Sequence, residues 1–208
     1  MSMARSRKPP EAGPAPAAAG QQPPRHGIDA ATLAAARRGE PWAQRAFVQW
    51  SQTPVFRLCT RMLGAAGRAG VVEDVTQEAL IRIVRALPRF VDDGPAKLST
   101  WVLTVATRTV IDDLRRRVRV VATFDPEVAI GPERADTGAE QHALAAAIAS
   151  ALDELAPEIR AAFVLRAYHE LTYPEIAAAL EIDLGTVKSR LWRARAALQV
   201  RLREVHHG

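Results

Sequence analysis

The sequence contains one cysteine and few aromatic residues, and these scarcities exclude several classes of protein. A single thiol, Cys59, cannot form an internal disulfide or a paired-cysteine metal site, so we interpret it as a core residue in a reducing compartment. Aromatic residues make up 5% of the 208 residues, whereas Ala and Arg are abundant. Because Ala and Arg favour helices and aromatic side chains favour strands, the composition predicts an all-α protein.

Long apolar runs and enzyme motifs are missing as well. No run approaches the roughly 18 apolar residues of a membrane helix, and no secretory signal opens the chain, which predicts a cytoplasmic protein without a membrane span. No glycine-rich phosphate loop, His-Glu-x-x-His motif or Cys/His cluster with ligand spacing occurs. We therefore expect no enzymatic activity, no metal and no cofactor.

The sequence does contain an excess of basic side chains. Its 28 Lys and Arg residues exceed the 23 Asp and Glu residues, which leaves a net charge of +5. Such an excess favours a polyanionic partner where the basic side chains cluster on one surface.

Composition divides the chain into four segments. Residues 1–27 hold six of the fourteen prolines and little apolar surface, so we expect a disordered tail. Residues 28–119 and residues 141–205 have helical periodicity and predict two small helical domains. Residues 120–140, with several prolines and glycines, predict a flexible linker between them.

The first domain contains a clear amphipathic helix over residues 72–87. Its apolar stripe opposes a polar face, on which Ile81 is an exposed apolar residue that favours a protein partner. A second helix, from Trp101 to about Arg119, ends in a cluster of arginines, and Pro54 predicts a kink or break in an earlier helix. The polar face of helix 72–87 consists of Asp74, Gln77, Glu78, Ile81 and Arg82.

The second domain contains two helix starts about eleven residues apart. Thr172 and Glu175 fit a capping box, and Asp183 is the natural N-cap of the next helix. A short helix, a tight turn and a longer basic helix predict a helix-turn-helix, with a solvated basic helix on an ordinary bundle as the alternative. The longer helix has its apolar residues on one side, and its predicted DNA-contacting residues are Thr186, Lys188, Ser189, Arg190, Trp192, Arg193 and Arg195. For the exposed Trp192, packing on a partner protein is the competing interpretation.

Two motifs, in the expected order, resemble bacterial sigma factors of the extracytoplasmic-function group. The segment LTYPEIAAALEIDLGTVKSRLWRARAAL at 171–198 resembles region four of that family. The segment DVTQEAL at 74–80, followed by ALPRF at 86–90 and STWVLTVATRTVIDDLRRR at 99–117, resembles region two. The resemblance spans roughly residues 28–205. It implies a region 2 helical bundle and a region 4 helix-turn-helix that bind core RNA polymerase and direct promoter-specific transcription initiation, without catalysis by the chain.

The resemblance also implies a role for each surface. The polar face of helix 72–87 would dock on the clamp helices of the largest polymerase subunit. Region four would contact the flap region of polymerase and read the minus-thirty-five promoter element. Members of the family are often held by an anti-sigma factor, although no residue of this sequence indicates one. The minus-ten element would be engaged, and its opened strand captured, by Phe90, Lys97, Ser99, Trp101, Arg108, Arg115 and Arg116, although the apolar neighbours of Trp101 favour a core role for it.

The sequence departs from the family pattern at a few positions. The loop between Phe90 and Trp101 is about two residues longer than usual and acidic, which leaves base choice at the minus-ten element open. Glu181 stands where glycine is common, and Leu184 where a polar residue is common. The alternatives to a sigma factor are a stand-alone helix-turn-helix regulator with a sensing N-terminal domain, a protein-binding helical adaptor and, with very low weight, an enzyme.

Overall fold

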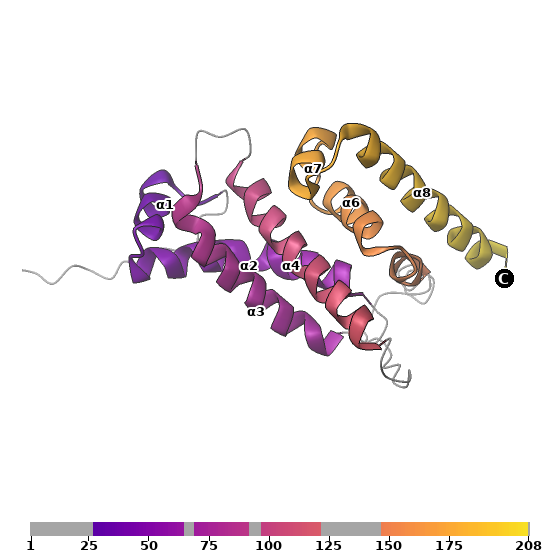
Figure 1. Cartoon of the computed structure of the whole chain (residues 1–208), viewed down its shortest axis with the longest axis horizontal. Helices are drawn as coiled ribbons and strands as arrows, with labels where there is room; N and C mark the ends of the chain where they lie inside the picture. The colour runs from indigo at the N-terminus through magenta and orange to yellow at the C-terminus, as the bar shows by residue number, and fades with distance from the viewer. Residues whose placement is uncertain (1–26, 65–68, 92–96, 122–146, 208) are drawn as a thin grey trace, which may run out of the picture.

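The computed structural model describes residues 27–64, 69–91, 97–121 and 147–207. The predicted tail and linker lie almost entirely outside these residues, as does the acidic part of the loop before Trp101. Within the described ranges every regular element is a helix, which confirms the predicted all-α class (Figure 1). The elements are α1 (Ala30–Arg37), α2 (Pro41–Leu63), α3 (Ala69–Ala86), the 3-10 helix η1 (Leu87–Arg89), α4 (Leu98–Val121), a helical stretch at 147–153, α6 (Pro157–Ala167), α7 (Tyr173–Leu180) and α8 (Leu184–His207).

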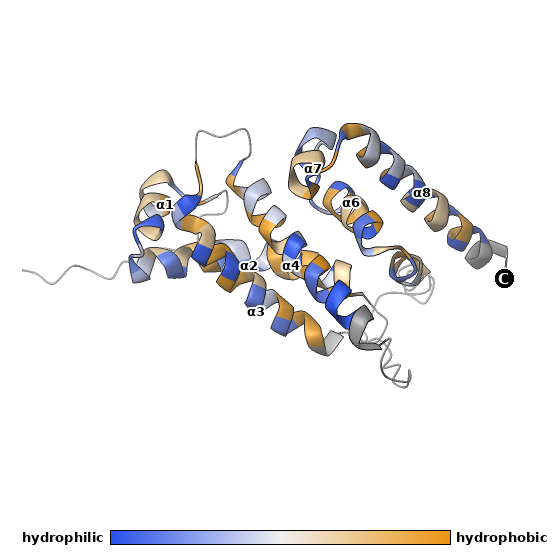
Figure 2. Cartoon of the chain, viewed as in Figure 1, coloured by the Kyte–Doolittle hydropathy of each residue, from blue (hydrophilic) through white to orange (hydrophobic). Residues whose placement is uncertain are grey.

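Helices α1 to α4 form a first unit around one apolar core. Figure 2 shows apolar and polar residues alternating along these helices, as amphipathic packing requires. Cys59 lies in this core, as predicted, and burial raises the pKa of its thiol to about 11. The predicted stripe of α3 and η1 faces the same core, with four of its members buried: Val75, Ala79, Ile83 and Leu87.

Of the predicted kink or break at Pro54, the break is wrong, because α2 runs through the proline without interruption. A proline inside a helix removes one backbone hydrogen bond and crowds the preceding turn. Here Phe47 and Ser51 before the proline, and Val55 and Leu58 after it, are all buried on one side of the helix. Burial on both sides of Pro54 offsets the lost hydrogen bond, so tertiary packing keeps α2 continuous.

The second unit is the predicted helix-turn-helix, α7 and α8, supported by α6. Thr172 and Glu175 form the complete capping box: the Thr172 backbone N–H donates to Glu175 Oε2 (2.8 Å), and the Glu175 N–H donates to Thr172 Oγ1. Asp183 caps α8 by accepting from the Thr186 N–H at 2.8 Å. In the turn, Glu181 has a left-handed backbone with φ of 54°, which explains why glycine suits this position.

The two units pack directly on each other. Helix α4 contacts α6 and α7, and α2 contacts α6, so that one continuous apolar cluster includes residues of both units. Ile176 of α7 and Val187 of α8 belong to the same cluster as Phe47 of α2 and Val110 of α4. The sequence predicts two domains on a flexible linker, and the described helices of the two units share one apolar cluster.

Removal of the capping hydroxyl should weaken this unit measurably. Thr172→Ala is expected to lower the free energy of unfolding by about 1 kcal/mol, because the Glu175 N–H loses its acceptor. Urea denaturation followed by circular dichroism measures the effect. Thr60→Ala, at an exposed position inside α2, is the matched control and should change stability little. Equal effects of the two substitutions would contradict the role assigned to the cap.

Candidate functional site

The outward face of α8 carries most of the predicted DNA-contacting side chains. Trp192 is 70% exposed, and Lys188, Ser189, Arg193 and Arg195 are exposed beside it. Lys188, Arg193 and Arg195 form no ion pair within the part of the chain that the structure describes, so their charges are available to an external anion. The opposite side of α8 is anchored in the core through Val187, Leu191, Ala194 and Leu198.

The N-terminal end of α8 is held rigidly by its cap. Thr186, half-buried, donates its hydroxyl to Asp183 Oδ2 at 2.6 Å, and the Ser189 hydroxyl donates to the Thr186 carbonyl at 3.0 Å. The hydrogen bonds from Thr186 lower the pKa of Asp183, so the cap is ionised near neutral pH. Leu184, which sequence reasoning did not include in the site, is exposed at this end of the helix. Its apolar side chain therefore extends the face toward the turn.

Helix α4 and the residue before it carry a second set of predicted DNA-contacting residues. Those that are exposed are Lys97, Ser99, Arg108, Arg115 and Arg116. We call this set the α4 face.

Two aromatic residues predicted with the α4 face belong largely to the core. Phe90 is 4% exposed and packs on the half-buried Trp101, with the ring centroids 5.1 Å apart. The side chain of Phe90 is therefore not available to DNA in this conformation, because the core encloses it. Trp101 fits the core role that its apolar neighbours predict.

Carboxylates of the second unit contact the α4 face, which sequence reasoning missed. Arg108 Nη2 lies 2.9 Å from Glu181 Oε1. Arg115 donates from Nε (3.1 Å) and Nη2 (2.7 Å) to Glu158 Oε1. Partial burial acts to raise the pKa of Glu158, but the hydrogen bonds from Arg115 and the positive charges of Arg115 and of Arg190 on α8 lower it. The paired residues are far apart in sequence, so no local pattern could have revealed these contacts.

The polar face of α3 is accessible to solvent, with Glu78 and Arg82 half-buried on it. Asp74 and Gln77 are exposed, and Ile81 is 45% exposed among them. Arg82, half-buried, donates to Glu78 at 2.7 Å and lies 3.5 Å from Asp112 of α4. We call Asp74, Gln77, Glu78, Ile81 and Arg82 the α3 patch; it borders a hollow of about 380 Å³ between α3 and α4.

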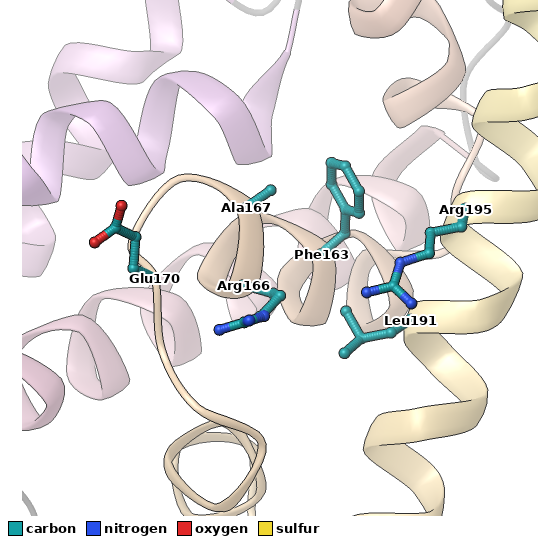
Figure 3. A pocket seen from close by; sticks show the side chains of 6 residues that line it. All are labelled: Phe163, Arg166, Ala167, Glu170, Leu191 and Arg195. Atoms are coloured by element: carbon teal, nitrogen blue, oxygen red, sulfur yellow. The ribbon is translucent and has the colours of Figure 1, made fainter.

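A larger pocket of about 520 Å³ lies between α6 and α8 (Figure 3). Phe163 and the buried Leu191 form its apolar part, and Arg195 extends beside them. Arg166 lines the pocket too and donates to the Leu171 carbonyl at 3.1 Å. Glu170 lies at the edge of the pocket, so apolar side chains flanked by charges of both signs suit a peptide segment with apolar and charged residues. Sequence reasoning did not identify this pocket, because its residues come from separate helices.

Either a metal-binding cluster or a helix that could span a membrane would bear on the function of the chain. No group of His, Cys, Asp and Glu within the described residues has the arrangement needed to hold a metal ion. None of the helices in these same ranges is long and apolar enough to cross a lipid bilayer.

Comparison with known protein families places these surfaces in a functional context. Residues 47–120 match the family described as Sigma-70 region 2, and residues 145–198 match Sigma-70, region 4. The first match contains the α3 patch and the α4 face, and the second contains the pocket and the basic face of α8. The fold and its surfaces thus define a helical, DNA-binding transcription factor.

Individual relatives make the assignment more specific. The chain is 33% identical over 183 residues to the ECF RNA polymerase sigma factor SigW of Bacillus subtilis, covering 81% of this chain and 94% of SigW. It is 37% identical over 149 residues to SigE of Mycolicibacterium smegmatis, where the match covers 70% of this chain and 56% of SigE. The chain belongs to the ECF group of RNA polymerase sigma factors, as its sequence motifs predict.

Solved structures agree on the fold. The sigma factor RpoE from Bartonella quintana, in complex with the anti-sigma factor NepR, superposes with a TM-score of 0.60 at 23% identity, covering 76% of this chain and 96% of RpoE. CnrH, in complex with the cytosolic domain of CnrY, gives a TM-score of 0.58 at 24% identity and covers 84% and 96% of the two chains. At this identity the similarity supports the arrangement of helices alone.

Proposed function

We propose that this chain binds core RNA polymerase and directs it to promoters, with α8 reading the minus-thirty-five element and α4 helping to open the minus-ten element. The observation that carries the proposal is the sidedness of α8, which is buried along one side and carries exposed basic side chains along the other. The chain itself would catalyse nothing, and it would act in the cytoplasm, where polymerase meets the chromosome.

The exposed face of α8 suits the major groove of duplex DNA. Arginine can donate two hydrogen bonds to a guanine edge or pair with phosphate, and Arg193 and Arg195 are both exposed for this purpose. Trp192 and Leu184 offer apolar contact to thymine methyl groups or the sugar backbone. The ionised Asp183 cap fixes the end of the helix that approaches the bases.

The α4 face suits a single strand. Arginines bind phosphates and stack on unpaired bases with little sequence preference, and Arg108, Arg115 and Arg116 are all exposed on α4. Lys97 and Ser99 are exposed at the N-terminal end of the helix. Phe90 would act indirectly, by supporting Trp101 from the core.

Two surfaces would serve contacts with other proteins. The α3 patch combines carboxylate and amide groups with the exposed Ile81, which suits docking on the clamp helices of the largest polymerase subunit. The pocket of Phe163, Arg166 and Leu191 would accept a segment of the flap region. One similar structure is a sigma factor in complex with an anti-sigma factor, and we extend the expectation of an anti-sigma partner to this chain.

Run-off transcription with purified core polymerase tests the proposal. Overexpression of the chain would reveal new transcription start sites, and the genomic fragments upstream of those sites would serve as templates. Initiation that requires addition of this chain supports a sigma factor. Duplex binding by the chain alone, without any effect on initiation by polymerase, would instead support a stand-alone regulator.

Arg193→Ala separates promoter reading from polymerase binding. Arg193 is exposed on α8, far along the chain from the α3 patch, so the substitution should leave polymerase affinity unchanged. Loss of one base-contacting arginine should weaken promoter-specific initiation by about tenfold or more. Run-off transcription and co-purification with polymerase measure the two effects. Parallel loss of both activities would contradict the assigned roles.

A further inference from the structure

The polar contacts between α4 and the second unit share one chemical character. Helix α4 contributes basic or hydroxyl side chains, and the second unit contributes carboxylates. Besides the Arg108 and Arg115 pairs, the Thr100 hydroxyl donates to Glu175 Oε1 at 3.2 Å. Three carboxylates, Glu158, Glu175 and Glu181, therefore face the helix that is proposed to hold the minus-ten strand.

Glu158 occupies a special position among them. It lies in the first turn of α6, and its pKa is below the ordinary value. Partial burial acts to raise the pKa, but the hydrogen bonds from Arg115 and the positive charges of Arg115 and Arg190 outweigh that effect. Glu158 is therefore an anion placed near one arginine of each proposed DNA-reading helix, α4 and α8.

We propose that these carboxylates stand in for DNA phosphates in the free protein, so that the second unit and the minus-ten strand compete for the same arginines of α4. The proposal rests on the function proposed above for the α4 face. A guanidinium group binds carboxylate and phosphate through the same fork of donors, so Arg108 and Arg115 cannot serve both partners at once. The apolar cluster shared by the units keeps the carboxylates in place until the units separate.

The competition has a quantitative consequence. We call the form in which the two units are separated the open form. When only a small fraction of the protein is open, the apparent affinity for a ligand of the open form equals the intrinsic affinity multiplied by that fraction. Exposed ion pairs contribute modestly to stability, so loss of the Glu158 and Glu181 pairs should increase the open fraction by about three- to tenfold. Affinity of the free protein for single-stranded DNA should increase by the same factor.

The test compares two double variants of the full chain that have the same change in net charge. Glu158→Gln with Glu181→Gln removes the negative charges that pair with Arg115 and Arg108, and it leaves Glu175 with its Thr172 cap intact. Glu73→Gln with Glu154→Gln is the control, because Glu73 is exposed on α3 and Glu154 pairs with Arg201 inside the second unit. The probe is a fluorescein-labelled oligothymidylate, followed by fluorescence anisotropy at low salt, and small-angle scattering reports the separation of the units.

The interface variant is expected to bind the probe about three- to tenfold more tightly than wild type and to have a larger radius of gyration, whereas the control should change affinity less than about twofold. Equal gains in both variants would overturn the proposal, because they would reflect net charge alone. Circular dichroism checks folding, and the single variant Glu181→Gln, at an exposed side chain, repeats the test with the least risk to the fold.

Run-off transcription separates this proposal from the proposed function. Polymerase would hold the two units apart in the complex, so the interface variant should support initiation as well as wild type does. If the wild-type chain fails to support initiation, the proposed function fails. If initiation succeeds but the interface variant binds the probe no better than the control, only the competition is wrong.

Discussion

Replacement of both Gln77 and Glu78 by alanine is expected to lower the affinity for core polymerase by at least about tenfold, and about thirtyfold if each side chain contributes roughly 1 kcal/mol. The two side chains lie next to one another on α3, beside the exposed Ile81, which makes them the centre of the α3 patch. Loss of Glu78 also releases Arg82 from its 2.7 Å hydrogen bond. The patch therefore loses a negative charge, and the Arg82 side chain is no longer held in its position. Titration of labelled protein with core polymerase measures the affinity.

A matched variant shows whether the effect belongs to the patch. Glu40→Ala with Gln52→Ala removes the same two side-chain types from positions outside the patch, one before α2 and one on its exposed side. This control should bind polymerase as wild type does. Circular dichroism should show unchanged helix content for both variants, since none of the four side chains is buried. Unaltered polymerase affinity of the Gln77 and Glu78 variant would show that another surface docks on the enzyme.

The features that can be predicted well from the sequence are those that depend on neighbours within about one helical turn. The cap at Asp183 and the box of Thr172 and Glu175 join residues three apart, and both are present in the structure. The buried side of α8 follows from helical periodicity alone. The outward position of Trp192 follows from the same periodicity, so the order of the amino acids is enough to identify most of the α8 face.

The features that cannot be predicted in this way depend on packing between distant segments. Pro54 has a local preference to end a helix, and the core on both sides of it overrides that preference. Phe90 is among the residues predicted to engage the minus-ten strand, and only its packing on Trp101 of α4 shows that its ring is enclosed. Glu158 reaches Arg115 across 43 positions of the chain, so the proposal that it substitutes for a phosphate required the three-dimensional arrangement.

Arg160→Ala is expected to destabilise the protein by about 3–5 kcal/mol, the largest stability effect predicted for this chain. Arg160 is 2% exposed, and its Nη1 donates to the Met62 carbonyl at the end of α2 (2.7 Å) and to Asp153 Oδ1 (2.8 Å). Its Nη2 donates to the Asp153 carbonyl at 2.5 Å. Alanine would leave the buried Met62 carbonyl and the part-buried Asp153 acceptors without that donor, and loss of a donor costs more when water cannot replace it.

The same guanidinium group connects the two units, so its loss should also change how they sit together. Urea denaturation measures stability, and small-angle scattering measures separation. Arg45→Ala, at an exposed position on α2, is the control and should shift stability by less than about 0.5 kcal/mol. Arg160→Lys keeps the charge but loses the planar fork, so it should restore only part of the stability. An Arg160→Ala variant as stable as the Arg45→Ala control would show that the buried network does not hold the units together.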